Sequence, residues 1–124
     1  MTFSDMALCD NVQRSITDAG YSVPTPIQQQ ALPVILDGKD VFGCAQTGPG
    51  KTAAFALPIL HRLDTERSHR DHPSVVILAP TRELAAQIGE SFTTYGKHIK
   101  ARHMTIFGGV NIRTQIQKVK RGVQ

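Results

Sequence analysis

Residues 45–52, AQTGPGKT, have the residue types of a loop that binds the phosphates of a nucleotide. Gly48 and Gly50 permit backbone conformations and close approaches that a Cβ atom forbids, so successive amides can converge on an anion. Lys51 would reach the β- and γ-phosphates, and the hydroxyl of Thr52 would ligate Mg²⁺. Lys51 and Thr52 are therefore the candidate catalytic residues, and a nucleotide with Mg²⁺ is the expected ligand.

Two residues of this loop are irregular, and one of them departs from the strict pattern G-x-x-x-x-G-K-[ST]. Ala45 stands where that pattern has glycine, and Pro49 lacks the N–H that another residue would offer to a phosphate. The alternative is an ordinary turn before a helix, with Lys51 exposed. Because the loop lies between an apolar run and a helical pattern, we favour phosphate binding.

The segment 20–28, GYSVPTPIQ, carries the start signals of a helix. Thr25 is a good N-cap, and Pro26 suits the first helical position. Gln28 stands where a capping box has Glu or Gln, which gives its side chain a structural role.

A second phosphate site is expected at residues 80–85, PTRELA. Thr81 would cap a helix whose first amides point at an anion, with Arg82 as the cation. The glycine pair 108–109 would let another stretch of backbone approach a phosphate. Arg82 could instead pair with a carboxylate such as Glu83 or Glu90, and the two glycines could form a plain tight turn.

The elements that must position these residues alternate between apolar runs and helical periods. The patterns predict helices at 8–19, 26–36, 51–63, 82–92 and 111–119, and buried strands at 40–45, 74–79 and 102–107. The last helix should face inward with Ile112, Ile116 and Val119. This order predicts an α/β fold with a parallel sheet, whose ligand loops follow the strands at 45–50, 80–82 and 107–111.

Composition and charge limit the function classes. The chain has 124 residues, enough for one domain, and Cys9 and Cys44 make no metal-ligand spacing. No apolar run could cross a membrane, so we expect a reduced, cytoplasmic protein. Residues 91–124 carry seven basic and no acidic side chains. That one-signed segment suits a polyanion such as nucleic acid, or is a solvated helix face.

Taken together, these motifs resemble the DEAD-box ATP-dependent RNA helicases, most closely the bacterial ones. The resemblance covers nearly the whole chain, and it explains Ala45 because the family's loop reads A-x-T-G-x-G-K-T. Residues 20–28 resemble the family's Q motif, 80–85 its motif Ia and 108–109 its glycine pair. Phe3 matches the isolated upstream aromatic residue of the family. Residues 1–38 then form the Q-motif region, and 39–124 part of the P-loop core of a RecA-like domain.

The resemblance implies two sets of binding residues. Those for ATP are Phe3, Tyr21, Gln28, Ala45, Gln46, Thr47, Gly48, Gly50, Lys51 and Thr52, with Thr52 also on Mg²⁺. Those for RNA are Pro80, Thr81, Arg82, Gly108 and Gly109, which would contact the backbone without reading sequence. Gln28 would meet the N6/N7 edge of adenine instead of capping its helix. Phe3 and Tyr21 would pack about the base, or could be plain core.

The family's T-P-G-R, D-E-A-D and S-A-T motifs and its second RecA-like domain are absent from these residues. We therefore expect the first part of a helicase, with negligible ATPase or unwinding activity alone and with exposed apolar strand edges. One alternative is a truncated module that binds ATP or RNA without catalysis. Another is an unrelated P-loop kinase or GTPase, which Gln28 and residues 80–85 argue against.

Replacing the proline of the loop tests its effect on nucleotide binding. Pro49→Ser in the full-length parent should tighten ATP binding about fivefold, because it restores one backbone donor worth ~1 kcal/mol. Titration of a fluorescent ATP analogue measures this difference. Unchanged or weaker binding would contradict a missing donor at Pro49.

Overall fold

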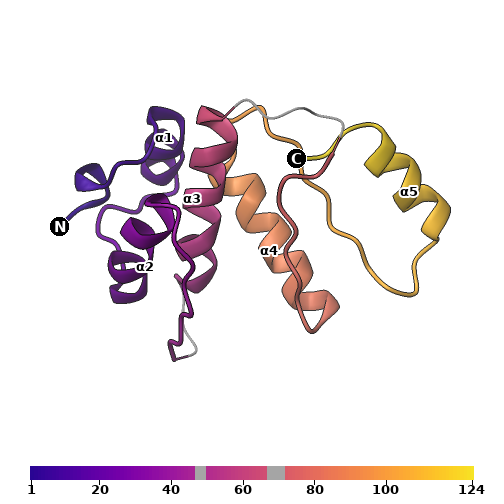
Figure 1. Cartoon of the computed structure of the whole chain (residues 1–124), viewed down its shortest axis with the longest axis horizontal. Helices are drawn as coiled ribbons and strands as arrows, with labels where there is room; N and C mark the ends of the chain where they lie inside the picture. Colours follow the sequence, from indigo (N-terminus) through magenta and orange to yellow (C-terminus); the bar gives the residue numbers. More distant parts are fainter. Residues whose placement is uncertain (47–49, 67–71) are drawn as a thin grey trace.

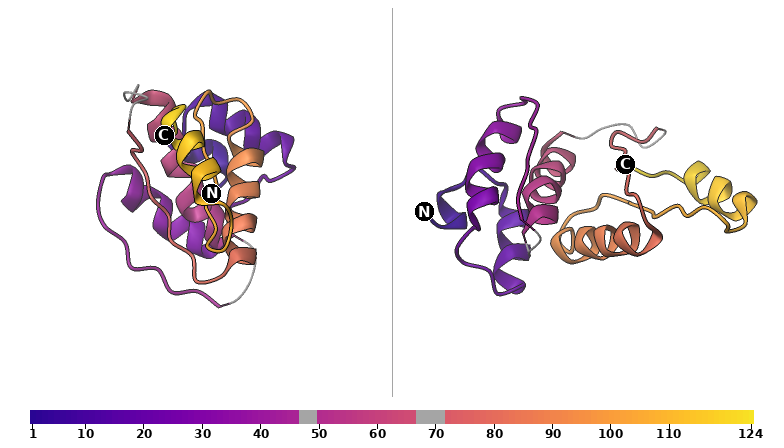
Figure 2. Two further views of the ribbon diagram at one scale, coloured as in Figure 1. Left: turned by 90° about the vertical axis from the view of Figure 1, so that its right-hand side faces the viewer. Right: turned by 90° about the horizontal axis from the view of Figure 1, so that it is seen from below.

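The structure is a computed structural model of the chain, and it describes residues 1–46, 50–66 and 72–124. Its elements are the 3₁₀ helix η1 (Phe3–Asp5) and the helices α1 (Asp10–Asp18), α2 (Pro26–Leu36), α3 (Lys51–Thr65), α4 (Arg82–Tyr95) and α5 (Ile112–Lys120). Helix α3 stands between α1 and α2 on one side and α4 on the other, whereas α5 lies apart (Figures 1 and 2).

The five predicted α-helices are all present, and their caps explain where they begin. Thr25 precedes Pro26 at the start of α2, whose bounds are those predicted. The hydroxyl of Thr81 accepts a hydrogen bond from Leu84 N–H at 3.1 Å and caps α4. Asn111 caps α5 in the same way. The other bounds differ from the prediction by a few residues.

The hydrophobic core lies along α3. Its buried face has residues at the spacing of one side of a helix, and it packs against α1, α2 and α4. The surrounding elements contribute Phe3, Val12, Ile16, Leu32 and Phe92, among others. Small residues on the α3 face, Ala53 and Ala56, let the neighbouring helices approach closely.

Polar and aromatic contacts join α1 to the end of α4. His98 Nε2 lies 2.6 Å from the carboxylate of Asp18, and Lys97 lies 3.6 Å from the same group. The hydrogen bond from His98 holds the pKa of Asp18 below its usual value. Tyr21, just after α1, lies against Tyr95 with ring centroids 6.3 Å apart. These contacts fix α4 relative to the N-terminal helices.

The three predicted strands are not formed: the structure assigns no strand to any residue that it describes. The segments 40–45 and 74–79, expected to be buried, are largely exposed, and Phe42 and Leu78 expose 100% and 91% of their surface. An apolar run becomes a buried strand only where neighbouring strands pair with it and helices cover it. Among the described residues, the backbone–backbone hydrogen bonds of these segments go to Gln124, whose carbonyl accepts from Ser74 and Val75 N–H and whose N–H donates to the carbonyl of Arg102.

The inward face predicted for the last helix is also wrong. Ile112 and Ile116 are exposed, Val119 is only partly covered, and α5 contributes no buried residue. The helical period placed these apolar residues on one side correctly, but no described element packs against that side. Across the described ranges, no helix is long and apolar enough to span a membrane, and no group of His, Cys, Asp and Glu could hold a metal ion.

Two matched substitutions test where the core lies. Leu57→Ala should lower the free energy of unfolding by about 2–5 kcal/mol, because Leu57 is fully buried. Leu78→Ala removes the same atoms from an exposed side chain and should cost less than about 0.5 kcal/mol. Urea denaturation of both variants measures the difference. Equal losses would mean that segment 74–79 is buried in solution.

Candidate functional site

The phosphate-loop end of α3 is held close to α2. Gly50 is the N-cap of α3 and has a φ of +112°, a conformation that favours glycine. A Cβ atom at Gly50 would lie 2.7 Å from Thr25 Oγ1 and 3.0 Å from Gln28 Nε2. The loop therefore needs glycine here for both its conformation and its close approach to α2.

Gln28 uses both ends of its amide, one to cap α2 and the other to join α2 to this loop. Its Oε1 accepts from Thr25 N–H at 2.9 Å, and its Nε2 donates to the carbonyl of Gly50 at 3.1 Å. The side chain is buried. The hydrogen bond from Thr25 N–H confirms the predicted capping role of the Gln28 side chain. The hydrogen bond from Gln28 to Gly50 was not predicted. Thr25 Oγ1 is buried beside Gly50 and has no hydrogen-bond partner in the described part of the chain.

Lys51 and Thr52 occupy the first turn of α3, next to this contact, and both are partly exposed. The first amides of a helix have no partner within the helix and create a positive potential, so this turn suits an anion. Ala45 and Gln46 lie in the segment that leads to the loop. The predicted contacts of Thr47 and Gly48, and the effect of Pro49, lie outside the described residues.

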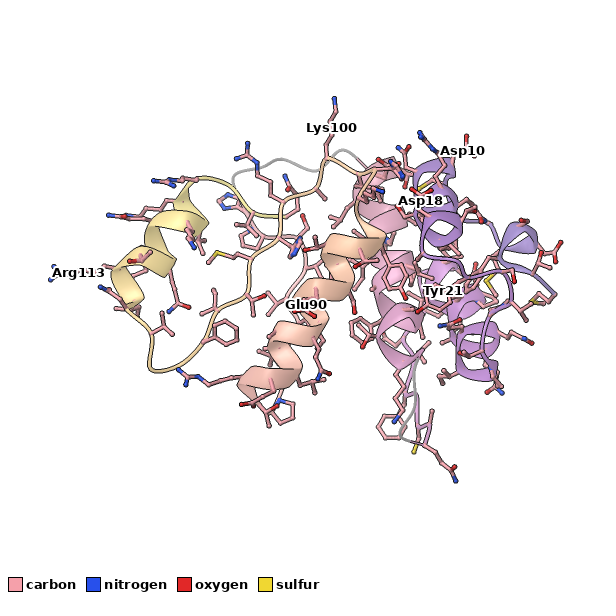
Figure 3. All side chains as sticks on the ribbon, turned by 180° about the vertical axis from the view of Figure 1, so that it is seen from behind. Asp10, Asp18, Tyr21, Glu90, Lys100 and Arg113 are labelled. Carbon is pink, nitrogen blue, oxygen red and sulfur yellow. The ribbon has the colours of Figure 1, made fainter. Side chains whose placement is uncertain are left out.

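The two aromatic residues expected near the base have different surroundings. Phe3 is 5% exposed and belongs to the core, so its side chain has the structural role that the sequence left open. Tyr21 is 52% exposed and rests against Tyr95 (Figure 3). Burial raises the pKa of Tyr95. Tyr21 therefore presents a free ring surface, and Phe3 does not.

The residues predicted to contact RNA come together at the start of α4. Arg82 Nη2 donates to the carbonyl of Gly108 at 2.7 Å. Gly109 has a φ of +77°, and a Cβ there would lie 3.2 Å from the same nitrogen. Within the described residues Arg82 makes no salt bridge, so the predicted alternative with Glu83 or Glu90 is not observed. Exposed Pro80 precedes the Thr81 cap.

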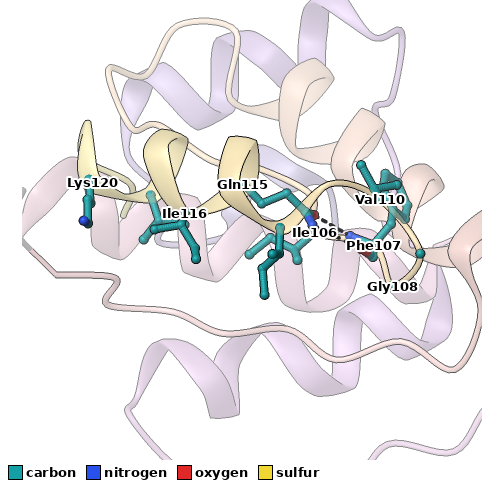
Figure 4. Close-up of a pocket in the computed structure, with 10 residues that line it drawn as sticks. Ile106, Phe107, Gly108, Val110, Gln115, Ile116 and Lys120 are labelled. Atoms are coloured by element: carbon teal, nitrogen blue, oxygen red, sulfur yellow. Dashed lines mark hydrogen bonds between the residues drawn. The ribbon is translucent and has the colours of Figure 1, made fainter.

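Gln115 of α5 supports this second site and was missed in the sequence. Its Oε1 accepts from Phe107 N–H at 2.9 Å, and its Nε2 donates to Phe107 O at 3.3 Å (Figure 4). These bonds hold the backbone just before Gly108, whose carbonyl Arg82 contacts. A glutamine within a helix gives no sequence signal for such a role.

Comparison with known proteins identifies the family. The family model of the DEAD/DEAH box helicases matches residues 25–124. The chain belongs to this family. It is 43% identical over 124 residues to ATP-dependent RNA helicase DeaD of Klebsiella pneumoniae, covering 99% of this chain and 19% of the relative. It is 45% identical over 126 residues to ATP-dependent RNA helicase CshA of Limosilactobacillus reuteri, covering all of this chain and 24% of the relative.

A solved DEAD-box structure has the same arrangement of the chain. The RNA helicase Prp28 from Chaetomium thermophilum, bound to ADP, superposes with a TM-score of 0.81 at 35% identity over 93% of this chain and 28% of that protein. The predicted resemblance to bacterial DEAD-box RNA helicases is confirmed. The chain spans about a fifth to a quarter of the length of its curated relatives.

Removing the Gln28 amide tests the link between α2 and the loop. Gln28→Leu should lower the free energy of unfolding by about 1–3 kcal/mol, because it leaves a buried N–H and a carbonyl without partners. Gln30→Leu, on the exposed side of the same helix, is the matched control and should change little. Thermal denaturation of both variants provides the measurement. Gln28→Leu as stable as Gln30→Leu would contradict the structural role of this amide.

Proposed function

We propose that this chain is the N-terminal portion of the ATP-binding RecA-like domain of an ATP-dependent RNA helicase, and that it acts in the cytoplasm. One observation carries the nucleotide assignment: the Gln28 amide touches Gly50 at the start of the helix that presents Lys51 and Thr52. A Q-motif residue and a phosphate loop are thus parts of one site. An unrelated P-loop kinase or GTPase gives no reason for that contact.

The residues around Gly50 fit a bound nucleotide. A Cβ atom would fill the space beside Gly50, and Thr25 Oγ1 is a buried hydroxyl that points into the same region. Lys51 would hold the β- and γ-phosphates, and Thr52 would ligate the Mg²⁺ that neutralises them. When bound, ATP supplies the phosphoryl group whose transfer to water drives the helicase. The amides at the start of α3 orient its phosphates.

Reading adenine would require Gln28 to change partners. In the structure its Oε1 and Nε2 bind Thr25 N–H and Gly50 O, whereas adenine offers N6 as a donor and N7 as an acceptor. The exchange replaces two hydrogen bonds with two others, so its net cost depends on how Thr25 and Gly50 are satisfied afterwards. Tyr21 offers an exposed ring for the base. Phe3 would support this surface from the core.

The RNA contact is proposed at the start of α4. Thr81, Arg82, Gly108 and Gly109 would contact phosphate and sugar, with Pro80 shaping the turn. Arg82 uses one of the five N–H donors of its guanidinium to bind Gly108 O. The remaining N–H groups suit the oxygens of a phosphate. These contacts position a strand without reading its bases.

We propose that the segments 40–45, 74–79 and 102–107 become strands of the family's parallel sheet when further strands pair with them. The backbone hydrogen bonds of Gln124 to Ser74 and to Arg102 support this, because they bring the starts of two of the segments to the same residue. Catalytic acids and a second RecA-like domain would come from residues beyond those present. The chain alone should therefore bind ATP or RNA without turnover, which is also what the alternative of a binding module predicts.

Nucleotide binding tests the assignment directly. Lys51→Ala should weaken ATP binding tenfold or more, because a charged hydrogen bond to phosphate contributes about 1.5–3 kcal/mol. Lys39→Ala is the control, since Lys39 pairs with Asp37 on the surface. Titration calorimetry with ATP and with GTP gives both affinities. An equal loss of ATP affinity in Lys51→Ala and Lys39→Ala would contradict the site, and tighter binding of GTP than of ATP would contradict its preference for adenine.

A further inference from the structure

Arg102 is held in position by its own backbone and side chain. Its N–H donates to Gln124 Oε1 at 2.6 Å, and its carbonyl accepts from Gln124 N–H at 2.9 Å. Its Nη1 donates to the carbonyl of Arg121, the C-cap of α5, at 3.2 Å. The guanidinium of an exposed arginine is thereby oriented beside a second arginine.

Two further cations lie close to this pair in the chain. Lys118 lies one turn before Arg121 on α5, and Lys100 lies two residues before Arg102 and points away from the ribbon (Figure 3). All four side chains are exposed, and none takes part in the ion pairs made by the described residues. We call Lys100, Arg102, Lys118 and Arg121 the Arg102 cluster.

The Arg102 cluster lies away from the site at Arg82. Arg102 begins the segment that ends at Gly108, and an extended chain of six residues spans roughly 20 Å. The two sites are therefore at opposite ends of one segment. A long polyanion could contact both, and binding at one would raise its effective concentration at the other.

We propose that the Arg102 cluster is a second contact for the phosphate backbone of RNA, separate from the site at Arg82 and Gly108. The proposal rests on the proposed function as an RNA helicase. Basic residues at the end of α5 also complement the helix dipole, which accounts for Lys118 but not for Arg102 or Lys100. An oriented guanidinium matches two oxygens of a phosphate, although it matches a carboxylate equally well. RNA is favoured over an acidic protein because a long, regularly charged backbone could reach this cluster and the site at Arg82 together.

The test is the salt dependence of RNA binding by this chain. The probe is a fluorescent oligouridylate of about 16 nucleotides. Its affinity is measured between about 50 and 200 mM salt, the range over which binding through phosphate contacts weakens strongly. Lys100→Gln/Lys118→Gln removes two charges whose side chains make no hydrogen bond among those described, so the fold is kept. It should weaken binding about tenfold or more and lower the salt slope by about 1.4, which is ~0.7 for each phosphate contact.

Arg14→Gln/Lys39→Gln is the matched control, because it removes the same charge from α1 and the end of α2. It should change the affinity less than about twofold, since it loses no phosphate contact. Equal effects of the two double variants would overturn the proposal, because net charge alone would then explain them. The proposal would also be overturned, in favour of an acidic protein, if Lys100→Gln/Lys118→Gln lost more affinity for poly-glutamate than for RNA.

Arg82→Ala separates this inference from the proposed function. Weaker RNA binding by Arg82→Ala, with Lys100→Gln/Lys118→Gln equal to the control, leaves the helicase assignment standing and overturns the Arg102 cluster. The opposite result supports the cluster and overturns the RNA contact at Arg82. No RNA binding by the unmodified chain at 50 mM salt overturns both.

Discussion

The burial of one face of α3 is the constraint on which the rest of the structure depends. Leu57 and Leu60 are buried on α3, which packs against α2 and α4, while the small side chains of Ala53 and Ala56 keep the helices close. Burying a leucine contributes about 2 kcal/mol, so these contacts outweigh any single surface interaction. A helix anchored along its length fixes the direction of its first turn. The core therefore sets the position of Lys51, the first residue of α3, from a distance.

A second constraint acts at the loop itself. The Gln28 amide links the start of α2 to the end of the loop, and Gly50 is the residue that permits this approach. If a ligand binds the Gln28 amide, Thr25 N–H and Gly50 O lose their partner and need other hydrogen bonds. By thermodynamic reciprocity, any change that strengthens the bond between Gln28 and Gly50 O weakens the binding of a nucleotide that needs Gln28.

The sequence predicted those features that depend on neighbouring residues in the chain. Caps at Thr81 and Asn111, the bounds of α2 and the family motifs are all local patterns, and they were right. The strands were wrong because pairing depends on distant partners that local apolar runs do not specify. Gln115 was missed for the same reason, since its partner at Phe107 is a backbone group. Arg82 and Gly108 were predicted to share a site and do lie in contact, but the hydrogen bond between them could not be read from residue types.

The distribution of the core along the chain has a consequence for folding. Apart from Phe92, every buried hydrophobic residue of the core lies between Phe3 and Leu60. The elements that form it, η1 and α1 to α3, are consecutive in the chain. During synthesis, which proceeds at about 5–20 residues per second, α1 to α3 can therefore pack before segment 102–107 has been made. The helical half would then serve as the surface on which the later segments are assembled.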